Sequence, residues 1–115
     1  MFEATPAQRA QILTLLQRRV PHLRALAFGS RVPQWPFGHG AKPYSDLDIA
    51  LWGVTRADDL ALAHLRADLE ESALPWRVDV CDAGDLPPAL RDLVRAHGTV
   101  LQDLPARQQI TEIAA

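Results

Sequence analysis

The first twenty residues have the apolar spacing of an amphipathic helix. Thr5 followed by Pro6 is typical of a helix start, because threonine caps the first turn and proline fits within it. The inward stripe of this helix is expected to contain Ile12, Leu13, Leu16 and Val20. Pro21 ends the pattern, because proline cannot donate the backbone hydrogen bond that another turn requires.

Short apolar runs predict buried strands farther along the chain. They cover residues 23–28 (LRALAF), 46–52 (DLDIALW) and 76–81 (WRVDVC). Each run is short for a helix and is followed by a turn signal, which favours extended structure. A fourth short strand is expected at residues 99–101.

Two more helices are predicted between these strands. The first would be capped by Thr55, and the second would run from Pro87 to about His97. Their inward residues are Leu62, Leu65 and Leu69 in the first, and Leu90, Leu93 and Val94 in the second. The resulting order predicts an α/β fold, with a small mixed β-sheet and helices packed on it. We expect residues 1–115 to form a single domain, with a tail from about residue 103 that forms a weak helix or a docking segment.

Composition excludes several classes of protein. The chain has 115 residues, a formal net charge of −2 and a single lysine, Lys42, so no direct binding to nucleic acid is expected. Cys81 is the only cysteine, which excludes an intramolecular disulfide. The start, MFEATPAQ, does not resemble a signal peptide, and no apolar run is long enough to span a membrane. A cytoplasmic protein is therefore expected.

Paired carboxylates are the strongest chemical signal. Asp46 and Asp48 lie two apart in a predicted strand, so both side chains point to the same face. If the strand that contains Asp79 is their neighbour, Asp79 joins that face. Like charges this close repel each other, and magnesium, which takes carboxylate oxygens as ligands, resolves the conflict. The alternative is a set of solvated aspartates at a sheet edge. We interpret Asp82 as a turn residue.

The remaining acidic residues of the second helix are expected to form a solvated face: Asp58, Asp59, Asp68, Glu70 and Glu71. The four histidines show no metal-ligand spacing, and each is interpreted as a surface or hydrogen-bonded residue.

A Gly-Ser turn follows the first predicted strand. Gly29 permits a close approach of backbone to a ligand, and Ser30 with the amides after it can bind phosphate. Arg31 places a cation beside them. Without the aspartates, the simpler interpretation of this dipeptide is a turn that only ends a strand.

Together, Gly29-Ser30-Arg31, the stretch Ser45-Asp46-Leu47-Asp48 and Val78-Asp79-Val80 resemble the DNA polymerase beta-like nucleotidyltransferases. More specifically, the chain resembles the small MNT-type minimal nucleotidyltransferases. The resemblance implies that Gly29 and Ser30 contact the nucleotide triphosphate, and that Asp46 and Asp48 bind two Mg²⁺ ions. Asp79 would bind the catalytic ion and help to activate the acceptor hydroxyl. Arg31 and Ser45 match residues common in the same nucleotide-binding motifs.

The spacing departs from the family at one place. Residues 31–45 separate Ser30 from Asp46, a longer gap than usual, with the extra length around Pro33–Gly40. Prolines at 33 and 36 would disturb a regular helix after the Gly-Ser turn. We expect this segment to be a solvated excursion, although Trp35 could stack on adenine and Lys42 could approach the triphosphate.

The resemblance also implies a function. MNT-type proteins resemble antitoxins that transfer AMP from ATP to a tyrosine of a helical HEPN ribonuclease toxin, usually as part of a homo- or hetero-oligomer. A small-molecule nucleotidyltransferase subunit, such as one that modifies an antibiotic, is a second interpretation. A third is an inactive antitoxin that neutralises its toxin by binding alone.

Overall fold

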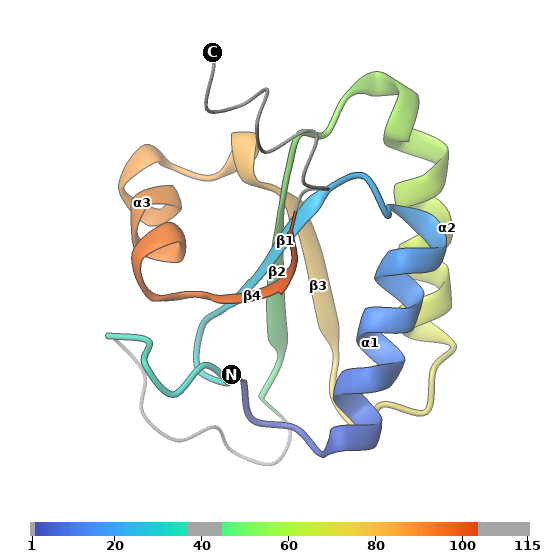
Figure 1. Ribbon diagram of the computed structural model, residues 1–115, viewed down its shortest axis with the longest axis horizontal. Helices are drawn as coiled ribbons and strands as arrows, with labels where there is room; N and C mark the ends of the chain where they lie inside the picture. Colours follow the sequence, from blue (N-terminus) through green and yellow to red (C-terminus); the bar gives the residue numbers. More distant parts are fainter. Residues whose placement is uncertain (1, 37–44, 104–115) are drawn as a thin grey trace.

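The computed structural model describes residues 2–36 and 45–103. These residues form a four-stranded sheet with helices on both sides (Figure 1). The elements are α1 (Pro6–Arg19), β1 (Arg24–Phe28), β2 (Leu47–Trp52), α2 (Asp59–Glu70), β3 (Val78–Asp82), α3 (Pro88–His97) and β4 (Thr99–Gln102), with short 3-10 turns at Arg56–Asp58 and Ala83–Asp85. Helices α1 and α2 lie together on one side of the sheet and α3 lies on the other. The predicted α/β class and element order are confirmed.

The sheet is mixed, as predicted. Its strand order is β3-β2-β1-β4, with β2 and β3 parallel and the other pairs antiparallel. Phe28 pairs with Asp48, and Asp48 pairs with Asp79. The end of β1 therefore meets the beginnings of β2 and β3, which is where the candidate chemistry was expected.

Helix α1 starts where the sequence predicts. The Thr5 hydroxyl accepts the Gln8 amide at 3.1 Å, and the Gln8 side chain accepts the Thr5 amide at 2.9 Å, which completes a capping box. The buried residues are Ile12, Leu15 and Leu16. Leu13 was expected to face inward, but it is 39% exposed because the buried stripe runs through its neighbours.

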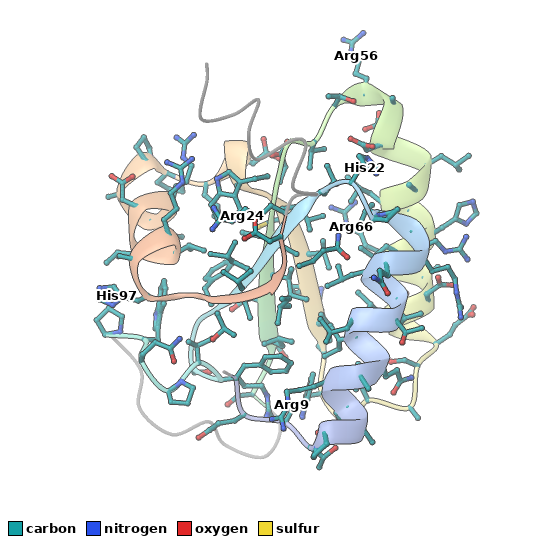
Figure 2. The ribbon with its side chains drawn as sticks, viewed as in Figure 1. Arg9, His22, Arg24, Arg56, Arg66 and His97 are labelled. Carbon is teal, nitrogen blue, oxygen red and sulfur yellow. The ribbon has the colours of Figure 1, made fainter. Side chains whose placement is uncertain are left out.

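The turn before α2 corrects one prediction. Asp58 was expected on a solvated face, but it is only 5% exposed. Its carboxylate accepts the Thr55 amide at 2.8 Å and lies 2.6 Å from Nε2 of His22, labelled in Figure 2. These contacts lower the pKa of Asp58, with the Thr55 bond as the larger cause. Asp68 was also expected to be solvated, yet it forms an ion pair with Arg19 at 2.7 Å.

Arg31, Val32 and Trp35 are buried, whereas Pro33, Gln34 and Pro36 are exposed, so the prediction of a solvated excursion is corrected in part. Val32 is fully buried and Trp35 is 7% exposed, with its ring packed 5.7 Å from that of Phe28. The amide of Val32 donates to the Gly29 carbonyl, and the amide of Trp35 donates to the Val32 carbonyl. Trp35 is therefore a core residue, and it is not free to stack on adenine.

Two predictions concern segments outside the described residues. They are the approach of Lys42 to the triphosphate and the docking role of the tail beyond residue 103. Across residues 2–36 and 45–103, no helix combines the length and apolarity that crossing a membrane requires.

Candidate active site

Two of the three predicted carboxylates are paired across the sheet, and the third lies next to them in the sequence. Asp48 and Asp79 are direct partners across the parallel strands β2 and β3, and Asp46 lies two residues before Asp48. The Leu47 amide donates to the Arg77 carbonyl at 2.9 Å, which fixes the two strands at this end. The neighbouring β2 residues Leu47 and Ile49 are fully buried on the opposite face.

The carboxyl group of Asp48 has a strongly raised pKa. Burial raises its pKa to about 6, and the negative charges of Asp79 and then Asp46 contribute further. An ionised Asp48 is therefore unfavourable here unless a cation lies nearby. This is the charge conflict that the sequence pattern implied.

The Asp79 carboxylate forms an ion pair with Arg77 of the same strand end. Its Oδ1 lies 2.9 Å from Nε of Arg77, and these side chains are 43% and 76% exposed, respectively. In the described part of the chain, no three His, Cys, Asp or Glu side chains converge closely enough to hold a metal as they stand. The donor set still fits magnesium, because it consists of carboxylate oxygens, and burial together with the neighbouring negative charges raises the pKa of Asp48.

Gly29 brings the end of β1 against this cluster. Its φ of +92° favours glycine, and a Cβ built there would lie only 2.8 Å from Oδ2 of Asp48. The close contact with the carboxylate explains why a glycine stands at this turn. Ser30 follows it and is partly exposed beside the same cluster.

Arg31, which follows Ser30, is buried and only 5% exposed. Its Nε donates to the Ser45 carbonyl at 2.6 Å and its Nη1 donates to the Glu3 carbonyl at 2.9 Å. The guanidinium also lies 4.4 Å from the centroid of the Trp76 ring. Burial lowers the pKa of Arg31, while the charges of Glu3 and Asp46 oppose that change.

Arg31 thus connects three segments that approach the carboxylates. Ser45 directly precedes Asp46, and Trp76 lies two residues before the first residue of β3, Val78. The sequence pattern did not indicate the roles of Trp76 and Glu3. Trp76 was expected to pack in the core or contact a partner, and nothing in the sequence pointed to the Glu3 carbonyl.

Two other side chains near the site have structural roles. Cys81 is partly buried on β3, and its thiol pKa is raised by burial and by the charge of Asp48. Asp82 accepts the Gly84 amide at 2.8 Å, which agrees with its interpretation as a turn residue.

Comparisons with known proteins point to one family. A Haemophilus influenzae protein named "Probable protein adenylyltransferase MntA" is 39% identical over 94 residues, which are 82% of this chain and 78% of that protein. No protein-family model matches this chain.

Solved structures of toxin–antitoxin complexes are also similar to this chain. A crystal structure of a toxin–antitoxin with AMP-PNP aligns with a TM-score of 0.63 and 25% identity, covering 92% of this chain and 82% of the other. A complex of a tri-AMPylated Shewanella oneidensis HEPN toxin with an MNT antitoxin aligns with a TM-score of 0.59 and 29% identity, covering 93% and 76%.

Proposed function

Because this chain belongs to the MntA family of protein adenylyltransferases, we propose that it transfers AMP from ATP to a tyrosine hydroxyl of a HEPN-type toxin, and so acts as the antitoxin of that toxin. The observation that carries the proposal is the in-register pair Asp48 and Asp79, with Asp46 beside it and Gly29 packed against Asp48.

Each residue of the site has a role in this proposal. Asp46, Asp48 and Asp79 would hold magnesium, which when bound neutralises the triphosphate and lowers the pKa of the acceptor hydroxyl. Gly29 and Ser30 would contact the phosphates, because the turn presents backbone without side-chain bulk. Arg31 and Ser45 are proposed to support nucleotide binding by fixing the start of β2 through the bond between them.

The reaction forms a bond between the acceptor oxygen and the α-phosphorus of ATP. The bond from that phosphorus to the bridging oxygen breaks, and pyrophosphate leaves. Asp79 would accept the proton of the hydroxyl, either directly or through water. The chain mainly positions the reactants and balances charge, as in other phosphoryl transfers.

Two relatives support the substrate and the partner. An ATP analogue occupies one similar toxin–antitoxin structure, and a HEPN toxin carries three AMP groups in another. We propose that the reaction takes place in the cytoplasm, because its proposed substrate is ATP and its proposed partner is a ribonuclease toxin.

The test is incubation with ATP, magnesium and the product of the neighbouring gene, which we expect to be a HEPN-type protein, followed by intact mass measurement of that product. We expect mass increases of one or more AMP units with the wild type and none with Asp46→Asn. Neutralisation of the toxin without ATP or any mass change would instead support an antitoxin that acts by binding alone.

A further inference from the structure

We propose that an N-terminal strap, formed by residues 2–4, positions the Gly-Ser turn for the phosphates of ATP. This inference rests on the proposed function, and it adds a segment that the sequence pattern did not connect with the nucleotide. In this proposal no side chain of the strap touches the nucleotide. The strap acts through Arg31, the residue that follows Ser30.

Two hydrogen bonds join Glu3 of the strap to Arg31. The Glu3 amide donates to the Arg31 carbonyl at 2.6 Å, and Nη1 of Arg31 donates to the Glu3 carbonyl at 2.9 Å. Both backbone groups of Glu3 are therefore bonded to a single residue that lies 28 positions later in the chain. Figure 1 shows the start of the chain beside the segment that leaves β1. This pairing restrains the backbone and the side chain of Arg31 together.

The Arg31 carbonyl belongs to the turn itself. The Val32 amide donates to the Gly29 carbonyl at 3.0 Å, so residues 29–32 form a hydrogen-bonded turn with Ser30 and Arg31 at its centre. On one side of this turn, Gly29 packs against the carboxylate cluster at φ +92°. On the other side, Glu3 holds the Arg31 carbonyl. The turn that is proposed to bind phosphate is therefore held both from the sheet and from the strap.

The strap is anchored at both of its ends. Phe2 is 3% exposed and belongs to the hydrophobic core. The Ala4 carbonyl accepts a hydrogen bond from Nη1 of Arg9, which lies on α1 and is labelled in Figure 2, at 2.7 Å. Glu3 is therefore held between the core and the start of α1. Its bonds to Arg31 come from a segment that is tied down, unlike most chain ends.

A turn that is already fixed favours nucleotide binding. A phosphate site gains affinity when its backbone has the bound conformation in advance, because binding then loses less conformational entropy. Arg31 also contacts the Ser45 carbonyl and the Trp76 ring, and these contacts orient its guanidinium rather than its carbonyl. Loss of the strap should therefore loosen the turn while β2 and β3 keep the carboxylates in place. The expected kinetic result is a higher KM for ATP with an unchanged kcat at saturating ATP.

A matched pair of variants at position 3 tests the strap without the toxin. Glu3→Pro removes the amide that donates to Arg31, whereas Glu3→Ala keeps it, and both variants lack the carboxylate. Isothermal titration with magnesium and a non-hydrolysable ATP analogue measures the dissociation constant. We expect Glu3→Pro to bind the analogue about tenfold more weakly than Glu3→Ala. Equal dissociation constants for the two variants would overturn the inference.

A second pair separates positioning from general stability. Phe2→Ala and Leu62→Ala each shorten a buried apolar side chain, the first on the strap and the second on α2. Both should lower the melting temperature, but only Phe2→Ala should weaken binding of the analogue, again about tenfold, when titrated well below both melting temperatures. The same loss of affinity in both variants, or wild-type affinity in a folded Phe2→Ala, would show that the strap only stabilises the fold. If Phe2→Ala does not fold, the pair at position 3 decides.

Measuring nucleotide binding also separates this inference from the proposed activity. Binding that is weakened in Glu3→Pro, without any transfer of AMP by the wild type, would retain the strap and reject the activity. Transfer of AMP, with equal binding by Glu3→Pro and Glu3→Ala, would retain the activity and reject the strap. A wild type that does not bind the analogue would reject both.

Discussion

Replacing Asp48 with asparagine should stabilise the metal-free protein while it abolishes the transfer of AMP. Asparagine has nearly the same shape as aspartate but carries no charge. It removes the unfavourable ionised carboxylate at the centre of the acidic cluster and, with it, a proposed magnesium ligand. Gain of stability with loss of activity is the result expected of a residue selected for chemistry rather than for folding.

The magnitude follows from the pKa of Asp48, which rises from 3.8 to about 6. At about 1.4 kcal/mol per pKa unit, an ionised Asp48 destabilises the folded state at neutral pH by up to about 3 kcal/mol. Because the side chain is only partly buried, solvent screening reduces this to about 1–2 kcal/mol. For a domain of this size, the melting temperature of Asp48→Asn should exceed that of the wild type by about 4–8 °C.

The stability difference between the wild type and Asp48→Asn should depend on pH. Because the folded-state pKa is raised, the contribution of Asp48 to stability is most favourable below its ordinary pKa of 3.8 and is lost as pH rises through about 6. The two proteins should therefore melt alike near pH 4 and differ fully by about pH 7. Thermal unfolding in EDTA across this pH range measures the difference in melting temperature. Magnesium with ATP should raise the melting temperature of the wild type but not that of Asp48→Asn. Equal or lower stability of Asp48→Asn at pH 7 would refute the charge-conflict argument.

Four further substitutions test the site and the structure around it. Gly29→Ala places a Cβ 2.8 Å from Oδ2 of Asp48 at φ +92°, so it should lower stability by about 1–2 kcal/mol and also reduce AMP transfer. Gly53→Ala, at φ +91° with its nearest contact at 3.6 Å, should lose similar stability but keep activity, and equal activity of the two variants would contradict the role of Gly29. Arg31→Ala should lower the free energy of unfolding in urea by about 2–3 kcal/mol, because two buried hydrogen bonds and a ring contact are lost, and an unchanged midpoint would count against this anchor. Asp58→Asn should destabilise the protein at neutral pH, because its lowered pKa gives stability that is lost as pH falls below about 4; a stability difference that does not vary with pH would contradict this.

Much of the fold could be predicted because local signals agree with the tertiary structure. Thr5 and Pro6 fix the start of α1, and short apolar runs that end at Gly29 and Gly53 define β1 and β2. The side-chain alternation of a strand placed Asp46 and Asp48 on one face. The position of Asp79 depended on β3 lying next to β2, which the parallel register confirms.

What the sequence did not reveal depends on contacts between distant segments. Asp58 is buried because His22, 36 positions earlier in the chain, meets it across the fold. Trp35 is buried because its segment turns back onto Phe28. The contact between Arg31 and Trp76 joins residues from distant parts of the chain. Composition and spacing describe neighbours along a strand or a helix, but they do not show which loops pack together.

The central claim is that the carboxylates of β2 and β3 bind divalent cations beside the phosphates of ATP. A crystal structure with Mn²⁺ and a non-hydrolysable ATP analogue tests it most directly, because anomalous scattering locates the ions. We predict manganese bound by Asp46, Asp48 and Asp79, with Asp79 released from Arg77 and the triphosphate at Gly29. Nucleotide bound elsewhere, with Asp79 still paired to Arg77 and no ion between the carboxylates, would contradict the account.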